Sequence, residues 1–131
     1  MKAILKKKLR KDLIAKDKES VYISLKTFKS PTYKMETKNY RIRIDELSDD
    51  KYRYASWKID KKESSKPDII LNNGQLEHSG TGGNHVITFS NNNYVYRIYK
   101  NNIGEVNSPD IILEVVKGGQ TILKEEGTLM E

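Results

Sequence analysis

Turn-forming residues recur at short intervals between residues 20 and 131, and the segments that separate them alternate apolar and polar side chains. The strongest turn signal is Asn73-Gly74, because both residue types tolerate the positive φ that a two-residue hairpin turn requires. Asn92-Asn93 and Gly118-Gly119 are two further turn signals of this kind. A hydrophobic period of two is typical of half-buried β-strands and not of amphipathic helices. The pattern therefore predicts a succession of antiparallel hairpins.

The number and spacing of the turns predict seven or eight short strands, which defines an all-β fold. A chain of 131 residues is long enough for one domain with a single hydrophobic core. We expect residues 20–131 to form this antiparallel β domain and residues 1–19 to form a short basic helix in front of it. A β-sandwich is favoured over a small barrel, and the strand pattern is compatible with both.

The hairpin over residues 40–59 can be aligned from its side chains. A four-residue turn at residues 48–51 places Ile42 opposite Trp57 and gathers the aliphatic side chains of both strands on one face. A shift by one residue would place Trp57 beside an arginine and mix the two faces. We expect the opposite face to be polar and exposed, and to carry Arg41, Arg43, Tyr52, Tyr54 and Lys58.

Three more hairpins follow from the two-residue turn signals. The Asn-Gly turn would pair Ile69 with His78, and the Asn-Asn turn would pair Phe89 with Tyr96. The Gly-Gly turn would join the apolar segment 111–117 to the segment that follows it. The Asn-Asn turn also places Ile87 opposite Ile98, so that apolar side chains face one another across this hairpin.

Residues 1–19 follow a different pattern, in which apolar residues recur every three or four positions without an intervening Gly or Pro. This spacing predicts a helix whose apolar stripe consists of Met1, Ile4, Leu5, Leu9 and Leu13. The segment contains 8 basic and 3 acidic residues, a charge of +5, and the other 16 basic and 15 acidic residues leave +1 for the β domain. We expect the stripe to pack on the β domain. The alternative is that the helix binds nucleic acid or an anionic membrane surface.

The residue types present exclude several kinds of chemistry. The absence of cysteine excludes disulfides, thiolate catalysis and cysteine metal sites. The Gly-rich segment 79–84 lacks the Gly-Lys-Ser/Thr ending of a phosphate-binding loop, and the chain has no Gly-x-Ser-x-Gly nucleophile motif. We therefore predict that the chain is not an enzyme and requires no cofactor.

His78 and His85 flank the same Gly-rich segment. If the flanking strands pair, the two imidazoles lie opposite each other and can share a metal ion. The sequence places no third ligand beside them. We therefore favour the interpretation that both are ordinary sheet residues, with a metal site as the alternative.

Most of the 8 tyrosines lie in predicted strands, and several are adjacent to arginine. Aromatic and arginine side chains on one sheet face stack on sugars or bases and are common at protein interfaces. Tyrosine is also a good strand residue, so ordinary packing explains many of them. We predict a binding module with a protein or glycan partner; nucleic-acid binding by the N-terminal helix and a barrel that holds a small ligand are the alternatives. The candidate binding residues are Arg41, Arg43, Tyr52, Tyr54, Lys58, Arg97 and Tyr99.

The basic N-terminal segment is not followed by an apolar run long enough for a secretory signal or a membrane span. On the sequence as written we expect a cytoplasmic protein, and an extracytoplasmic one if a leader is missing. The sequence does not determine the oligomeric state.

Overall fold

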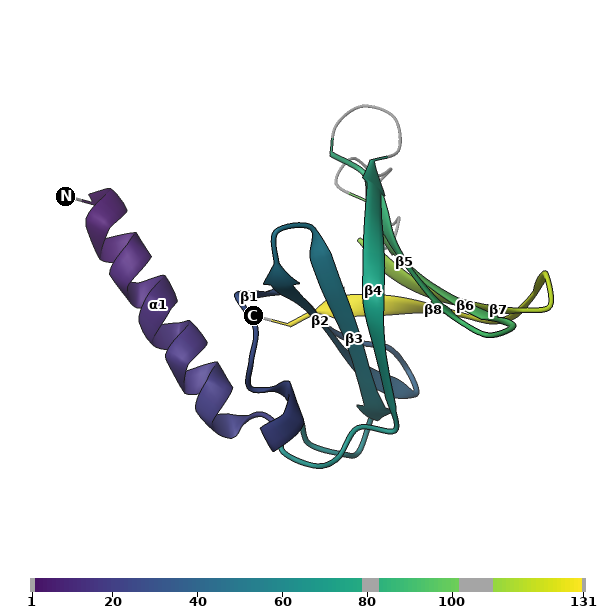
Figure 1. Ribbon diagram of the computed structural model, residues 1–131, viewed down its shortest axis with the longest axis horizontal. Coiled ribbons are helices and arrows are strands. Elements are labelled where there is room, and N and C mark those ends of the chain that lie inside the picture. The colour runs from purple at the N-terminus through teal and green to yellow at the C-terminus, as the bar shows by residue number, and fades with distance from the viewer. Residues whose placement is uncertain (1, 79–82, 102–109, 131) are drawn as a thin grey trace.

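The computed structural model describes residues 2–78, 83–101 and 110–130, and for residues 2–9 it describes the backbone alone. A long helix is followed by a short 3₁₀ helix and by strands that form one curved sheet (Figure 1). The elements are α1 (Lys2–Ser20), η1 (Ile23–Leu25), β1 (Ser30–Glu36), β2 (Tyr40–Ser48), β3 (Lys51–Lys58), β4 (Ile69–His78), β5 (His85–Asn91), β6 (Tyr94–Lys100), β7 (Ile111–Lys117) and β8 (Gln120–Leu129).

The strands follow one another in chain order around a closed barrel, and neighbouring strands are antiparallel. Closure occurs where β1 meets β8, through the pairs Met35–Leu129 and Glu36–Thr128. The all-β prediction is confirmed, and the sheet adopts the barrel arrangement instead of the sandwich that the sequence favoured. Pairing the first strand with the last is how barrels avoid exposed strand edges.

β4 connects the two halves of the barrel, because its first half pairs with β3 and its second half pairs with β5. The predicted hairpin at Asn73-Gly74 is therefore wrong. Both residues lie inside this one strand, and His78 pairs with His85 instead of Ile69. Asn73 has a φ of +61°, and the pairing with β3 is irregular at this point. The Asn-Gly signal thus marks a bulge where the strand bends around the barrel.

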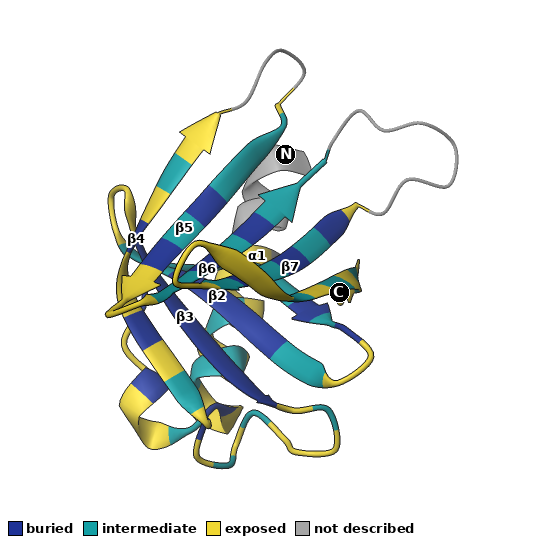
Figure 2. Cartoon of the chain, turned by 90° about the vertical axis from the view of Figure 1, so that its right-hand side faces the viewer, coloured by how far each residue is buried: buried dark blue, intermediate teal, exposed yellow. Residues whose placement is uncertain are grey.

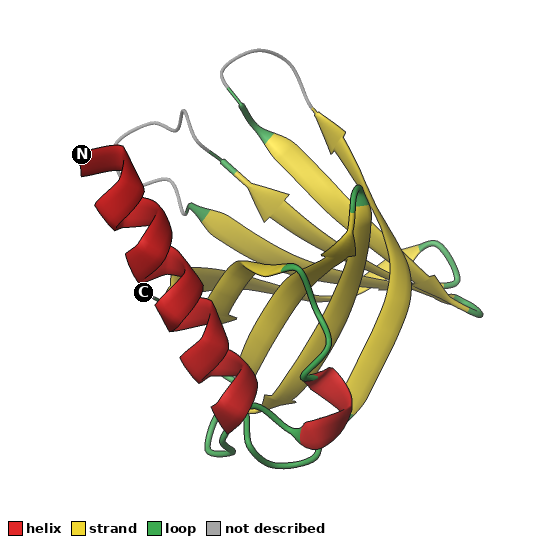
Figure 3. Cartoon of the chain, turned by 60° about the vertical axis from the view of Figure 1, so that its left-hand side comes forward, coloured by secondary structure: helices red, strands yellow, loops and turns green. Residues whose placement is uncertain are grey.

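The β2–β3 hairpin closes through a two-residue turn, Asp49-Asp50, preceded by a bulge. The predicted register is consequently wrong by one residue, since Ile42 faces Ser56 and Trp57 faces Arg41. The prediction assumed that one face of this hairpin would be exposed. In the structure both faces are buried, because α1 and η1 lie on the outer side of β2 and β3 (Figure 3).

The other two predicted turns are confirmed. β5 and β6 turn at Asn92-Asn93 and pair Phe89 with Tyr96, as expected. β7 and β8 turn at Gly118-Gly119, whose φ values of +56° and +82° favour glycine. In both hairpins the turn residues and the alternation of the flanking strands agree, so the local sequence identifies the turn.

The main hydrophobic core fills the barrel interior, and buried residues alternate with less buried ones along β5, β6 and β7 (Figure 2). This alternation follows from the pleat of each strand, which sends successive side chains to opposite faces. Residues of this core without exposed surface are Met35, Ile42, Ile44, Ile87, Phe89, Ile98 and Ile111.

A smaller apolar cluster lies between the outer face of β3 and the segment that leads from α1 to β1. It consists of Val21, Leu25, Phe28, Ala55 and Trp57, with Ile14 of α1 packed against it. The indole Nε1 of Trp57 donates a hydrogen bond to the backbone oxygen of Ser65 at 2.8 Å, so its polar atom is satisfied. This cluster attaches the C-terminal half of α1 to the barrel.

The predicted apolar stripe does not make the contact between the C-terminal half of α1 and the barrel. Leu13 is 64% exposed, whereas its neighbour Ile14 contacts the barrel. The side chains of Met1, Ile4, Leu5 and Leu9, which would complete the stripe, lie outside the described residues. Ile14 and Asp17 attach the helix instead. Ile14 packs against the apolar cluster on the outer face of the barrel, and Asp17 forms an ion pair with Arg43 of β2.

Candidate functional site

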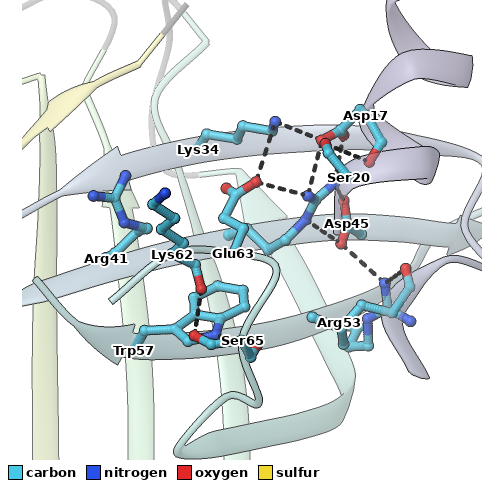
Figure 4. Close-up of polar contacts among 12 residues, drawn as sticks. Asp17, Ser20, Lys34, Arg41, Asp45, Arg53, Trp57, Lys62, Glu63 and Ser65 are labelled. Carbon is cyan, nitrogen blue, oxygen red and sulfur yellow. Dashed lines mark hydrogen bonds and ion pairs between the residues drawn. The ribbon is translucent and has the colours of Figure 1, made fainter. Parts of the chain in front are cut away.

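A buried cluster of charged side chains joins the end of α1 to the outer face of β2 and β3 (Figure 4). Arg43 lies at its centre, without exposed surface, and donates to Asp17 (Nη2–Oδ2, 2.7 Å) and to Asp45 (Nε–Oδ2, 2.7 Å). Lys34 pairs with the same Asp17 at 2.7 Å, and Arg53 pairs with the same Asp45 at 3.0 Å. Glu63 supplies a third carboxylate, 3.3 Å from Arg43 and 3.5 Å from Lys34, so three cationic and three anionic side chains compensate one another. The cluster therefore attaches the helix and is not a free basic surface.

Asp17 makes this attachment sensitive to acid. Burial opposes its ionisation, but hydrogen bonds from Arg43 and Lys34 outweigh burial and hold the pKa of Asp17 below its usual value. A depressed folded-state pKa adds stability that is present above the unfolded pKa of about 3.9 and is lost as the pH falls through the folded pKa.

We therefore expect the free energy of unfolding to decrease as the pH is lowered below about 4, and Asp17→Asn to remove part of that decrease. Urea unfolding at a series of pH values, on both chains, measures the difference. Identical pH dependence in the two chains would contradict the pairing of Asp17.

The residues predicted to share the outer face of the β2–β3 hairpin do not share one surface. Tyr52 and Tyr54 belong to the core of the barrel interior. Arg43 is buried in the ion-pair cluster, and Arg41 is half-buried and ion-paired. Lys58 is exposed at the end of β3. The predicted grouping is wrong because the β2–β3 register differs by one residue from the predicted register. Such a shift moves the side chains of one strand to the opposite face relative to those of the other strand.

A pocket of about 270 Å³ opens at the end of the barrel where β2 and β6 begin, and we call it the tyrosine pocket. Four tyrosines from three strands line it, together with aliphatic side chains and the hydroxyl of a buried serine. Its lining residues are Tyr40, Tyr54, Ser56, Ile69, Tyr94, Tyr96, Leu113, Val115, Ile122 and Leu123. The pocket is thus mostly apolar with a few polar groups, which is the usual composition of small-molecule sites.

The aromatic rings of this pocket form a connected wall. The centroids of Tyr54 and Tyr96 are 5.3 Å apart with an interplanar angle of 50°, and those of Tyr94 and Tyr96 are 6.4 Å apart. Phe89 continues the contact into the core, 5.7 Å from Tyr54. These separations are within the range of favourable aromatic pairs. The wall therefore extends from a buried floor at Tyr54 to a partly exposed rim at Tyr94.

Burial favours the neutral form of two phenols in the tyrosine pocket, those of Tyr54 and Tyr96. It raises the pKa of Tyr54, against a hydrogen bond with Ser56 that lowers it, and it also raises the pKa of Tyr96. Both hydroxyls therefore remain able to donate hydrogen bonds at neutral pH. The side chains that line the pocket in the described part of the chain carry no formal charge. The arrangement suits an uncharged molecule with an apolar body and hydrogen-bonding groups.

His78 and His85 lie opposite each other on β4 and β5, with ring centroids 6.1 Å apart. His85 is already engaged, because its Nε2 is hydrogen-bonded to the hydroxyl of Tyr33 and its Nδ1 lies 3.0 Å from the backbone oxygen of Gly83. Within the described residues, no three His, Cys, Asp or Glu side chains are grouped as metal ligands. A metal ion shared by the two histidines therefore stays the alternative to the favoured interpretation that both are ordinary sheet residues.

Arg97 and Tyr99 lie together on the outer face of β6, apart from the other predicted binding residues. Both contact Glu114 of β7, which accepts hydrogen bonds from the Tyr99 hydroxyl at 3.0 Å and from Arg97 Nη1 at 3.5 Å. They border a hollow of about 470 Å³ that extends over β4, β5 and β6. The structure thus brings this predicted pair into a second candidate site.

The basic residues of α1 are only partly described. Arg10, Lys11 and Lys16 are exposed, near the exposed Leu13. Asp17, by contrast, is used in the ion-pair cluster. Binding of nucleic acid or of an anionic surface by this helix stays an untested alternative.

Comparison of the chain with protein-family models, with curated proteins and with solved structures finds no match. Its class is therefore defined by architecture, as a closed antiparallel barrel with a tyrosine pocket at one end and a helix on its outer wall. None of the helices described here is long and apolar enough to cross a membrane.

Sequence reasoning missed the tyrosine pocket, although part of its signal was present. The confirmed β5–β6 register places Tyr94 and Tyr96 on the same face as the buried Phe89, since alternate residues share a face. Tyr40 and Tyr54 reach the pocket only through the correct β2–β3 register and the closure of the barrel.

Proposed function

We propose that this barrel is a non-enzymatic binding module for a small uncharged molecule with a ring and hydrogen-bonding groups, held in the tyrosine pocket. The observation that carries the proposal is the composition of the pocket, four tyrosines and aliphatic residues around about 270 Å³. Barrels of eight strands are just wide enough to be filled by their own side chains or to hold one small ligand. Here the core fills the interior beyond Tyr54, so the ligand occupies one end only.

The size and polarity of the pocket limit the ligand. A dry apolar cavity of about 150 Å³ is large enough for benzene. The tyrosine pocket therefore accommodates a molecule somewhat larger than a single ring. The phenolic hydroxyls and Ser56 both donate and accept hydrogen bonds, which gives polar specificity. A charged ligand is disfavoured because no lining charge compensates its desolvation.

A larger side chain in the wall of the pocket should weaken binding of the ligand. Val115 lines the pocket, whereas Val116, the next residue of β7, points to the other face of the sheet. We expect Val115→Phe to weaken binding of the neutral fluorescent probe N-phenyl-1-naphthylamine at least tenfold, about 1.4 kcal/mol. The matched variant Val116→Phe should bind the probe as the wild type does. Fluorescence titration measures both, with thermal unfolding as a check that each variant folds.

A second variant, at the rim of the pocket, keeps the proposal testable if Val115→Phe does not fold. Ile122 lines the pocket but is 55% exposed, so Ile122→Trp obstructs the entrance without adding volume to the core. It should also reduce probe affinity. The proposal is wrong if the wild type does not bind the probe, or if both Val115→Phe and Ile122→Trp bind it unchanged.

A further inference from the structure

A second concave surface lies on the outside of the barrel, across β4, β5 and β6, and encloses about 470 Å³. We call it the polar hollow. Two rows of cross-strand neighbours form its floor, Gln75–Thr88–Arg97 and Glu77–Val86–Tyr99. The residues between these rows, Leu76, Ile87 and Ile98, belong to the core or pack against it. The polar hollow and the tyrosine pocket are therefore on opposite faces of the sheet and share no lining residue.

Glu114 holds the two largest side chains of the polar hollow in place. Its Oε1 accepts hydrogen bonds from Tyr99 and Arg97, and its Oε2 accepts one from the Thr121 hydroxyl at 3.0 Å. The Glu114 side chain is only 14% exposed. Burial opposes its ionisation, but the hydrogen bonds from Tyr99 and Thr121 outweigh burial and keep the pKa of Glu114 below its usual value. The charged carboxylate thus orients Arg97 and Tyr99 before any ligand arrives.

The charge balance of the polar hollow disfavours an anionic ligand. Arg97 contributes one positive charge to the lining and Glu77 contributes one negative charge, and Arg97 is also paired with Glu114 beside the hollow, so the lining has no excess positive charge. Phosphate and nucleic acids are bound by surfaces with excess positive charge. The remaining polar groups of the floor, such as the Gln75 amide and the Thr88 hydroxyl, supply both donors and acceptors. These properties match a neutral ligand that is rich in hydroxyl groups.

We propose that the polar hollow binds a neutral carbohydrate. Each sugar hydroxyl donates and accepts hydrogen bonds, as do the side chains of Gln75 and Thr88. The guanidinium of Arg97 has N–H donors beyond the one that contacts Glu114 at 3.5 Å. The half-exposed ring of Tyr99 offers an apolar face to the C–H side of a sugar ring. Bridging water extends such contacts over a shallow surface.

The test is a titration of the full chain, labelled with ¹⁵N, with maltohexaose, cellohexaose and mannohexaose, followed by NMR. We expect at least one of these sugars, at up to about 10 mM, to shift the amide resonances of residues 75, 88, 97 and 99. Arg97→Met should weaken that binding at least tenfold. Lys66→Met is the matched control, because Lys66 is exposed in the segment before β4 and does not line the hollow, and it should bind the sugar as the wild type does.

The positioning role of Glu114 has its own readout. Glu114→Gln should weaken sugar binding and should also shift the side-chain Nε–H resonance of Arg97 in the absence of sugar, because the neutral amide no longer fixes the guanidinium. An unchanged Arg97 resonance would contradict this role.

Three results would overturn the carbohydrate proposal: none of the sugars shifts these resonances, an oligonucleotide shifts them more strongly in a salt-dependent manner, or they shift with protein concentration alone. The last result would identify a second copy of the chain as the occupant. Val115→Phe should bind sugar normally, so this test is independent of the tyrosine pocket.

Discussion

Replacing Arg43 by methionine should lower the free energy of unfolding by about 3–5 kcal/mol. The guanidinium has no exposed surface and is bonded to Asp17 and Asp45. Methionine fills a similar space but leaves the fully buried Asp45 with Arg53 alone, and Asp17 with Lys34 alone. A buried carboxylate that loses its main partner keeps the cost of desolvation without the compensating attraction. Urea denaturation at neutral pH measures this loss.

Arg41→Met is the matched control for this experiment. Arg41 lies on the same strand and pairs with Glu36 at 2.7 Å, but both side chains are partly exposed to solvent. Ion pairs of this kind contribute about 0–1 kcal/mol, so we expect a loss near 1 kcal/mol. A loss of similar size for Arg43→Met would show that the ion-pair cluster is hydrated in solution and does not attach the helix.

Gly74→Ala should lower the free energy of unfolding by about 2–3 kcal/mol, because the barrel has no room for the added methyl group. A Cβ atom at this position would lie 2.3 Å from Cε1 and 2.5 Å from Cζ of Phe89. Phe89 has no exposed surface and is surrounded by the core, so its ring cannot move aside without disturbing other residues. The expected loss therefore measures the close approach of β4 to this ring.

The reason for this loss can be isolated with a second substitution. Phe89→Leu removes the ring edge that the new methyl group meets, so the double variant should be more stable than the sum of the single losses predicts. Gly127→Ala is the matched control, because the atom nearest to its Cβ is Cε of Met35, the end of a flexible side chain. We expect it to cost less than about 1 kcal/mol. Additive losses for Gly74→Ala and Phe89→Leu would contradict the steric explanation.

The hairpins show how far the local sequence predicts this fold. At Asn92-Asn93 the turn chemistry and the alternation of both strands point to the same register, and the structure has that register. At Asp49-Asp50 the alternation was misread, because the outer face of the hairpin buries Arg43 and Trp57 as completely as the inner face buries Ile42. Asp45 is only two residues from Arg43, but Asp17 and Glu63 come from distant segments, so the local pattern does not show that this arginine is buried.

The candidate sites were predictable to different degrees. Arg97 and Tyr99 alternate on one strand, so their common face follows from the sequence, and the structure adds the carboxylate of Glu114 beside them. The tyrosine pocket was not predictable, since it requires Tyr40 of β2 and Tyr94 of β6 to meet across the barrel. The local pattern of apolar and polar residues in either strand does not determine the curvature of the sheet, and therefore does not determine which strands face each other across the barrel.

By itself the sequence determined that the chain forms antiparallel strands with an N-terminal helix, because helix and strand periods and tight turns depend on residues a few positions apart. The tertiary structure alone decided that the sheet closes into a barrel, that Asn73-Gly74 bends a strand instead of ending it, and that Arg43 is buried. Each of these outcomes depends on contacts between segments far apart in the chain. Packing at those contacts, and not local preference, selected which face each side chain occupies.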